Sequence, residues 1–261
     1  MSQFAVTSLN INGIRAGARK GFFDWLSECD PDVVCLQEIK AQEHQLDKAP
    51  FLPAGYHRYL HPAERPGYSG VAIYSKQEPD HVQYGIGWPD FDCEGRFLRA
   101  DFGSLSVVSL YLPSGSAKDS RQDFKMQILD RLVPLLRQWQ QEPREFILCG
   151  DWNIAHKKID IKNWRGNQKN SGFLPEERAW MDQLFGELGW VDGFRQLNDQ
   201  DEQYTWWSNR GQAWANNTGW RIDYQVLTPG IAERLVSEDI YREQRFSDHA
   251  PLTLQYRGQL A

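Results

Sequence analysis

The feature that most constrains the fold of this chain is a series of short apolar segments rich in β-branched residues. Each is four to seven residues long, and most are flanked by glycine, proline, asparagine or aspartate, a pattern typical of β-strands. Because predicted strands outnumber helices, we expect an α/β fold of two packed sheets with helices outside rather than a simple alternating βαβ wheel. The predicted strands are Phe4–Leu9, Val33–Leu36, Val71–Tyr74, Phe97–Phe102, Ser106–Leu112, Phe146–Cys149, Ile222–Leu227 and Leu252–Tyr256.

Three segments between these strands have helical patterns. Apolar residues recur every fourth position from Phe124 to Leu136, which predicts an amphipathic helix, and Pro134 should kink it or end its regular hydrogen bonding. A second helix is predicted from Pro175, at a favoured first position, to Leu188 before a glycine. A third runs from about Lys20 to Glu28.

Length and composition are those of an ordinary soluble globular protein. The chain has 261 residues, 41% hydrophobic and 25% charged, so we expect one domain over residues 1–261. No apolar segment approaches the ~20 residues of a membrane span, and the start lacks a secretory signal pattern. The four cysteines have no C-x-x-C spacing, and three lie in or beside apolar segments. We therefore expect buried free thiols in a reducing compartment, the cytoplasm.

The net charge of −6 argues at first against a nucleic-acid partner. The charge is uneven, however, because the segment 156–170 carries five bases and one acid. This segment is either a solvated loop or a binding site for a polyanion, and the charge alone leaves both interpretations open. The chain also contains 11 tryptophans, several of them in predicted loops.

Polar side chains gather where the predicted strands end. For a single asparagine or glutamate among them, the capping of a turn is a sufficient explanation. Asp223 is different, because it lies within an apolar strand, where an unpaired carboxylate is costly. His249 is its best available partner, either in a catalytic Asp–His pair or in a structural hydrogen bond. The full set is Asn10, Asn12, Glu38, Asp151, Asn153, Asp223, Asp248 and His249.

Oxygen donors with at most one imidazole suit Mg²⁺ or Mn²⁺ and argue against zinc. Glu38 could be the only direct protein ligand, helped by Asp248 or Asn12, because Mg²⁺ usually keeps several waters. The sequence contains neither a phosphate-binding glycine loop nor a dinucleotide fingerprint. No serine or cysteine nucleophile is paired with a base, which favours attack by water on phosphorus.

Several motifs, in this order along the chain, resemble the exonuclease III family of abasic-site endonucleases, within the endonuclease/exonuclease/phosphatase superfamily. The resemblance runs from residue 7 to 251 and implies a four-layer α/β sandwich with the site at one edge of the sheets. CGDWNIAH combined with GWRIDY and SDHAPL is specific, whereas LQE or SDH alone would be weak. The motifs are SLNINGIRA, LQEIKA, GYSGVAIYSK, SLYLPSG, CGDWNIAH, GNQKNSGF, GWRIDY and FSDHAPL.

The resemblance also implies roles for matching positions. Asp151 matches the carboxylate that orients or deprotonates the attacking water, and Asn153 the carboxamide that steadies the reacting phosphate. Tyr111 matches a tyrosine that contacts this phosphate, and Asp223 and His249 match an Asp–His pair. The residues implied at the metal, directly or beside it, are Asn10, Asn12, Glu38, Asp151, Asn153, Asp248 and His249.

A second set of positions is implied in DNA contact. Ser114 departs from the family pattern, since many relatives have asparagine there, although a hydroxyl can still bond a phosphate oxygen. Trp206, Trp220 and Ile222 would form the apolar pocket for a flipped-out sugar that lacks its base, whereas Trp207 would point the other way along a strand. The DNA-contacting residues would be Arg15, Ser114, Lys162, Arg165, Asn167, Lys169 and Asn170.

The expected function is therefore metal-dependent hydrolysis of duplex DNA 5′ of abasic sites by a monomer, with 3′-5′ exonuclease or 3′-phosphodiesterase activity. The alternative is mainly a 3′-5′ exodeoxyribonuclease with little abasic-site activity. Inositol phosphatases and sphingomyelinases are disfavoured by the basic GNQKNSGF loop and by the lack of a membrane-binding apolar hairpin or signal sequence. A secreted DNase I-like enzyme is disfavoured by the cysteine usage. The non-enzyme alternative is a relative that binds DNA or protein and has lost catalysis. Such a relative would lack a catalytic group, whereas this sequence retains Glu38, Asp151, Asp223 and His249.

Overall fold

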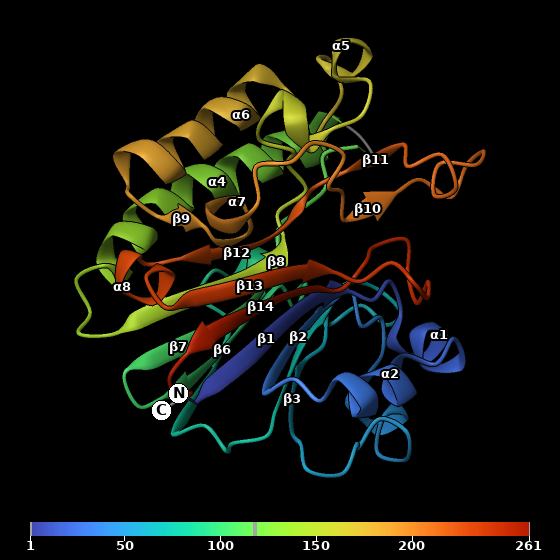
Figure 1. The fold of residues 1–261 in the computed structure, drawn as a ribbon, viewed down its shortest axis with the longest axis vertical. Coiled ribbons are helices and arrows are strands. Elements are labelled where there is room, and N and C mark those ends of the chain that lie inside the picture. The colour runs from blue at the N-terminus through green and yellow to red at the C-terminus, as the bar shows by residue number, and fades with distance from the viewer. Residues whose placement is uncertain (1, 117–118, 261) are drawn as a thin grey trace.

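The computed structural model, which describes residues 2–116 and 119–260, contains two six-stranded sheets packed face to face (Figure 1). Strands β1 and β2 are parallel, as are β7 and β8, and the other pairs are antiparallel. The first sheet has the order β13 (Leu235–Ile240), β14 (Leu252–Arg257), β1 (Gln3–Asn10), β2 (Val33–Gln37), β4 (Val71–Ser75), β3 (His57–His61). The second has the order β5 (His81–Tyr84), β6 (Phe97–Phe102), β7 (Leu105–Tyr111), β8 (Glu145–Asp151), β12 (Asp223–Leu227), β9 (Val191–Asp192).

Helices cover the outer face of each sheet, so the fold is the four-layer sandwich that the sequence predicts. In Figure 1, α4 and α6 lie outside the second sheet, and α1 and α2 lie beside the first. The helices are α1 (Ile14–Arg19), α2 (Phe22–Cys29), α3 (Pro89–Asp92), α4 (Asp119–Trp139), α5 (Trp164–Asn167), α6 (Pro175–Asp182), α7 (Gly193–Leu197) and α8 (Pro229–Ala232). Shorter helical turns are η1 (Glu43–Gln45), η2 (Lys158–Asp160) and η3 (Gln183–Glu187), and a small ribbon joins β10 (Trp206–Trp207) to β11 (Gly219–Trp220).

The hydrophobic core has three main parts, one between the sheets and one under each helical layer. Val6, Cys35 and Ile147 are among the buried residues between the sheets. Leu129 of α4 and Trp180 of α6 pack on the outer face of the second sheet, and the first sheet is covered by residues of α2. Burial of apolar surface on both faces explains why the central strands read as continuous apolar runs.

Every predicted strand is present, with small shifts at its ends. The segment 222–227 begins one residue later, at Asp223. The helix predicted from Pro175 is α-helical as far as Asp182 and continues as the π-helical turn η3 to Glu187. Of the two effects predicted for Pro134, a kink or an end of the regular helix, the second is not observed, because α4 continues to Trp139. Its buried face, from Ile128 to Trp139, packs on the sheet and offsets the missing hydrogen bond.

A buried ionic network ties the segment before Asp223 to the second sheet. The Arg221 guanidinium donates Nε to Asp160 Oδ1 (2.8 Å) and Nη2 to Asp192 Oδ2 (2.7 Å), and Arg195 Nη2 also donates to Asp160 Oδ1 (2.7 Å). Burial alone would raise the pKa of Asp160, but Arg221 and then Arg195 lower it to about 2. The ionised carboxylate therefore stabilises the fold above the unfolded pKa of about 3.9, and this contribution is lost as the pH falls through 2.

Replacing Asp160 by asparagine is expected to lower the free energy of unfolding by about 3 kcal/mol at pH 7, because the buried Arg221 loses one of its two carboxylate partners and keeps only Asp192. The difference from wild type should shrink between pH 4 and pH 2. Urea unfolding at several pH values measures both effects. The matched control is Glu187→Gln, which removes an exposed ion pair with Arg137 and should change stability by less than about 1 kcal/mol. Equal effects of the two substitutions would contradict the prediction.

Within the described residues, no helix is long and apolar enough to span a membrane.

The prediction of buried free thiols is confirmed for Cys35 and Cys149 but is wrong for Cys29, which is exposed at the end of α2.

Candidate active site at one edge of the two sheets

The strand topology brings the predicted site residues to one edge of the sandwich. Asn10 ends β1 and Glu38 follows β2, which runs parallel to β1. Tyr111 and Asp151 are register partners at the ends of the parallel strands β7 and β8, and Asp223 faces Asp151 across the antiparallel β8–β12 pair. The two sheets meet at this edge, where Asn10 Nδ2 donates to Asp151 Oδ2 at 2.9 Å.

The backbone turns sharply directly after three of these strands. Asn12, Glu38 and Asn153 have φ angles of +45°, +51° and +52°, in the left-handed region that costs a non-glycine residue free energy. Two of these turns are held by specific hydrogen bonds: Asn10 Oδ1 accepts from Asn12 N (3.0 Å), and Asp151 Oδ1 accepts from Asn153 N (2.8 Å). The strain is therefore balanced by contacts that also fix the direction of the polar side chains.

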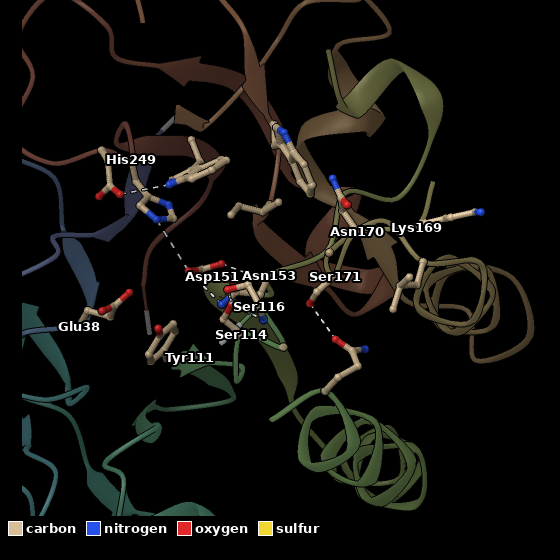
Figure 2. Close-up of a pocket in the computed structure, with 18 of the residues that line it drawn as sticks. Glu38, Tyr111, Ser114, Ser116, Asp151, Asn153, Lys169, Asn170, Ser171 and His249 are labelled. Atoms are coloured by element: carbon tan, nitrogen blue, oxygen red, sulfur yellow. Dashed lines mark hydrogen bonds and ion pairs between the residues drawn. The ribbon is translucent and has the colours of Figure 1, made fainter. Parts of the chain in front are cut away.

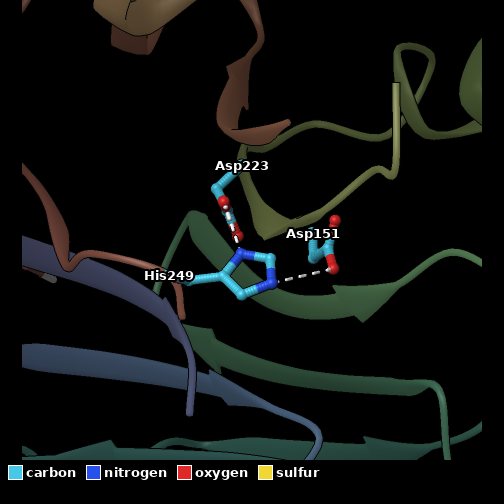
Figure 3. A group of neighbouring side chains, drawn as sticks. All are labelled: Asp151, Asp223 and His249. Atoms are coloured by element: carbon cyan, nitrogen blue, oxygen red, sulfur yellow. Dashed lines mark hydrogen bonds and ion pairs between the residues drawn. The ribbon is translucent and has the colours of Figure 1, made fainter. Parts of the chain in front are cut away.

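Asp223 and His249 form the pair that the sequence suggests. His249 Nδ1 lies 2.9 Å from Asp223 Oδ2, and Nε2 lies 3.9 Å from Asp151 Oδ2 (Figure 3). Both members of the pair are buried. Burial alone would lower the pKa of His249, but the charge and hydrogen bond of Asp223, with Asp151, raise it to about 10. The imidazole is thus protonated at neutral pH, with Nε2 directed toward Asp151.

The carboxyl group of Asp151 has a pKa close to neutral pH. Burial and the like charge of Asp223 raise its pKa to about 7, against the opposing effects of His249 and of hydrogen bonds from Asn10 and Asn153. A pKa near the working pH suits a general base, because the group is partly ionised and still basic.

A second group of oxygens lies at the end of β1 and β2. Asn12 Nδ2 donates to Asp248 Oδ1 (2.8 Å), and Lys40 Nζ contacts both Glu38 Oε2 (2.7 Å) and Asn12 Oδ1 (2.5 Å). Burial would raise the pKa of Glu38, but Lys40 and the amide of Asn10 lower it, so the carboxyl group is ionised. One oxygen of Glu38 and one of Asn12 therefore already converge on a cation, the Lys40 ammonium.

This donor set fits a hard divalent cation. Carboxylate and amide oxygens are the ligands that Mg²⁺ prefers, and Glu38, Asp248 and Asn12 supply them. Asp151, Asp223 and His249 also offer ligand atoms within 4.8 Å of one another. That cluster is the poorer site, because His249 already shares Nδ1 with Asp223 and is protonated. Asn10 bridges the two groups, since its amide donates to both Glu38 and Asp151.

A cavity of about 770 Å³ opens over these groups. Figure 2 shows Glu38 and Tyr111 at one side and Lys169 and Asn170 at the other, with Asp151 and Asn153 between them. The cavity is lined by Glu38, Tyr111, Ser114, Gly115, Ser116, Asp119, Gln122, Asp151, Asn153, Lys169, Asn170, Ser171, Gly172, Leu174, Trp206, Arg210, Trp220, Ile222, Asp248 and His249.

Trp206 and Trp220 form the aromatic wall of this cavity. They are register partners in the β10–β11 ribbon, with ring centroids 5.9 Å apart and planes at 86°. Trp206 Nε1 donates to Asp248 Oδ2 (3.1 Å), which joins the wall to the oxygen group, and Ile222 lies beside it. Trp207 is fully buried against Trp214 instead, as the alternation of side chains along a strand predicts.

The residues predicted to contact DNA are only partly brought together. Ser114, Lys169 and Asn170 line the cavity. Asn167 accepts from Asn170 Nδ2 at 2.7 Å and so supports the loop. Lys162 forms an ion pair with Glu202, and Arg165 lies over the Trp164 ring, 4.7 Å from its centroid. Arg15 lies at a different depression, beside Arg19 and Lys48.

Some residues of the site have no clear signal in the sequence. Arg210 is an exposed residue of the loop after β10 that lines the cavity, and Gln122 reaches it from α4. Lys40 follows Glu38 closely in the sequence, but its position between two acceptor oxygens, of Glu38 and Asn12, depends on the turn at Glu38. These side chains come from segments that are close only in the folded chain.

Comparison with known proteins agrees with this geometry. Residues 7–249 match the endonuclease/exonuclease/phosphatase family. The chain is 41% identical to the exodeoxyribonuclease of Bacillus subtilis, over 95% of this chain and 97% of that protein. It is also 41% identical to the DNA repair nuclease APEX1 of Danio rerio, over 95% of this chain and 81% of that protein.

A solved structure supports the same conclusion at the level of the fold. An AP endonuclease from Archaeoglobus fulgidus superposes with a TM-score of 0.89 at 30% identity, covering 98% of this chain and all of that one. The match includes both sheets and therefore the edge where the site lies. On sequence and structure together, this chain belongs to the endonuclease/exonuclease/phosphatase family.

Proposed function

We propose that this protein is a metal-dependent DNA-repair phosphodiesterase that hydrolyses the backbone 5′ of abasic sites, with 3′-5′ exonuclease or 3′-phosphodiesterase activity in addition. The observation that carries the proposal is one cavity that combines a buried carboxylate of raised pKa with an aromatic wall. The two relatives named above, an exodeoxyribonuclease and a DNA repair nuclease, support the same class of substrate. All the groups required lie on one chain, so a monomer suffices.

In this proposal, Asp151 accepts the proton of the attacking water, since its pKa near 7 matches this role. The water oxygen bonds to phosphorus as the P–O3′ bond breaks, and the departing 3′ oxygen takes a proton from solvent to become a 3′ hydroxyl. Protonated His249, held by Asp223, donates Nε2–H to an oxygen of the reacting phosphate. Asn153 and Tyr111 border the same space and hold that phosphate in line with the water. Mg²⁺, or Mn²⁺ as a substitute, held by Glu38 with Asp248 and Asn12, would neutralise negative charge on the phosphate.

The aromatic wall accounts for recognition of a missing base. An extrahelical sugar without a base needs a pocket that is apolar and too small for an intact nucleotide. Trp206, Trp220 and Ile222 supply that surface beside Asp248 and His249.

Trp220→Ala is expected to raise KM for an abasic duplex and to reduce its preference over intact DNA by about tenfold, since stacking on an aromatic side chain is worth about 1–3 kcal/mol. The measurement is a kinetic comparison on both duplexes, after the thermal transition shows that the variant is folded. Trp88→Ala is the matched control, a half-buried tryptophan outside the cavity. A folded Trp220→Ala variant with wild-type selectivity would assign this side chain to packing alone.

The basic loop should contribute affinity without selectivity. Replacing both Arg165 and Lys169 by alanine is expected to reduce the slope of log affinity against log salt by about 0.9 for each phosphate that the loop no longer neutralises. The control is the double substitution of Arg131 and Arg137, which lie on α4 and pair with Asp90 and Glu187. Binding titrations at several salt concentrations measure the slope. An equal slope in wild type and the loop variant would identify a solvated loop.

The competing function is a 3′-5′ exodeoxyribonuclease with little abasic-site activity, favoured by the name of the Bacillus subtilis relative. One assay separates the two. Equal amounts of an abasic duplex and a duplex with a recessed 3′ end are incubated with the protein, with Mg²⁺ and with EDTA. The proposal requires faster cleavage of the abasic duplex, and faster loss of the recessed end with an uncut abasic duplex would establish the competing function.

A further inference from the structure

A buried ion pair lies beneath the candidate site and takes no part in the mechanism above. Lys125 of α4 and Glu177 of α6 are both fully buried, with Nζ 2.5 Å from Oε1. Burial of two charges is costly, and an apolar pair of similar volume would pack at least as well. Packing alone therefore does not account for these two residues.

The pair is bonded to both sides of the cavity. Lys125 Nζ donates to the backbone oxygen of Asn153 at 2.7 Å. Glu177 Oε2 accepts from Gly172 N (2.7 Å) and Leu174 N (3.0 Å). Its Oε1 also accepts from Gln122 Nε2 (3.1 Å), and Gln122 Oε1 accepts from Ser171 Oγ (2.7 Å) (Figure 2). Asn153 and the loop that carries Lys169–Gly172 are thus joined through one buried ammonium–carboxylate contact.

Both attachment points are places where the backbone is conformationally demanding. Asn153 has a φ of +52°, which an asparagine adopts stably only when its surroundings hold it there. Gly172 has a φ of +92°, and an added Cβ would lie 3.0 Å from Asn153 O and from the Trp220 ring. A further hydrogen bond, from Ala155 N to Gly172 O (2.8 Å), closes the contact. A small displacement of either segment would therefore move the Asn153 side chain relative to the cavity.

We propose that Lys125 and Glu177 are positioning residues, which fix Asn153 and the loop 169–174 in the mutual geometry needed to hold the reacting phosphate. The inference rests on the proposed function, because it assigns phosphate contact to Asn153. Neither residue touches substrate: both side chains are completely buried. Lys125 acts through the Asn153 carbonyl, and Glu177 through the Gly172 amide and through Lys125.

The test uses Lys125→Met and the double variant Lys125→Met/Glu177→Gln. The single variant leaves a buried carboxylate without its cation and should be less stable and slower. The double variant removes that charge but keeps an oxygen acceptor for Gly172 N, so its thermal transition should largely recover. Its kcat on an abasic duplex should stay about 10- to 100-fold below wild type, the cost of a misplaced reacting group, with KM changed less than about threefold.

Two further comparisons separate positioning from general stability. In an Asn153→Ala background, Lys125→Met should lower kcat less than about threefold, because the residue it positions is gone. Arg99→Met breaks another buried ion pair on β6 and should lower stability. At temperatures well below the melting temperature of this variant, its kcat should equal that of wild type. If kcat recovers with stability in the double variant, or if the effects of Lys125→Met and Asn153→Ala are fully additive, the pair is structural and the inference is wrong.

Hydrogen exchange provides a readout that does not need activity. Lys125→Met/Glu177→Gln should speed amide exchange in residues 151–156 and 169–174, whereas Arg99→Met should leave both segments unchanged. If the wild-type protein does not cut abasic DNA, the proposed function fails, and exchange still decides whether the pair couples the two segments. Unchanged exchange in both segments would overturn the inference even for an active enzyme.

Discussion

Replacing Asp151 by asparagine is expected to lower kcat on an abasic duplex by about 10³-fold, with little change in DNA affinity. The substitution keeps the shape of the side chain and one oxygen to accept from the Asn153 backbone amide, although the second acceptor oxygen, which faces Asn10, becomes an NH2 group. It removes the group proposed to accept a proton from water, and general bases contribute about 10²–10⁴-fold. In wild type, kcat should rise with pH through about 7, where the buried Asp151 ionises. Single-turnover kinetics between pH 5 and 9 measure both effects.

The same substitution should make the metal-free protein more stable at high pH. Folding raises the pKa of Asp151, through burial and the charge of Asp223, to about 7. A group of this kind stabilises the fold fully below its unfolded pKa of about 3.9, and the contribution is lost as the pH rises through 7. At pH 8 in EDTA, keeping this carboxyl group ionised in the folded protein costs about 4 kcal/mol. The acceptor oxygen that asparagine lacks costs about 1–3 kcal/mol. The free energy of unfolding of Asp151→Asn is therefore expected to be about 2 kcal/mol above that of wild type.

The matched control for both measurements is Asp130→Asn, at an exposed position of α4. It should change neither rate nor stability appreciably. An Asp151→Asn variant that retained more than about a tenth of wild-type kcat would remove Asp151 from the role of base. A variant that was inactive but also destabilised at pH 8 would show that the wild-type carboxylate is well compensated by His249 and Asn10.

Removal of divalent metal is the second change with a very large expected effect. Activity should vanish in EDTA and return on addition of Mg²⁺, and Glu38→Ala should lower activity at saturating DNA by orders of magnitude, because the phosphate loses a cation that neutralises its charge. The Mg²⁺ concentration that restores half the activity should rise in Glu38→Ala. A Mg²⁺ titration of wild type and variant on the abasic duplex gives both values.

Glu43→Gln is the control for that experiment, an exposed glutamate in the nearby turn η1, and it should titrate like wild type. Lys40 contacts Glu38 and Asn12, so the thermal transition of Glu38→Ala must also be recorded to show that the turn survives. Full activity in EDTA would exclude a metal-dependent mechanism. A Glu38→Ala variant with an unchanged Mg²⁺ requirement would place the cation elsewhere, with Asp151, Asp223 and His249 as the remaining cluster.

Whether a strand could be predicted from the sequence depends on its position in the sheet. The predicted strands include β1, β2, β7 and β8, whose residues are almost all buried, so their composition is dominated by contact with other apolar groups. The missed strands include β3, β5 and β13, edge strands whose residues are largely exposed or half-buried. Edge strands carry polar and charged residues, and these give no apolar run to detect.

The same reasoning applies to α4. The local cost of Pro134 predicts an interruption, since proline removes one backbone donor. The structure keeps the helix to Trp139 because Leu132, Leu136 and Trp139 all pack against the second sheet. Local propensity is a small term beside the burial of several large side chains.

For the site, the sequence by itself determined the chemical inventory. Asp151 and Asn153 lie at or directly after the end of an apolar strand, and Asp223 begins one. An unpaired charge buried there is too costly to be incidental. The need of Asp223 for a partner could be read from the sequence, and the structure supplies His249 at 2.9 Å. Such inferences succeed because burial of a charge imposes a requirement that neighbouring residues must meet.

Only the tertiary structure decided which groups act together. It paired Trp206 with Trp220 across the β10–β11 ribbon, and it engaged Lys162 with Glu202, far along the chain. It also raised the pKa of Asp151 through burial and a strand register that sets Asp223 opposite, and it set Lys125 beneath Asn153. Interactions of this kind depend on distance and exclusion of water, and the packing of the two sheets fixes both.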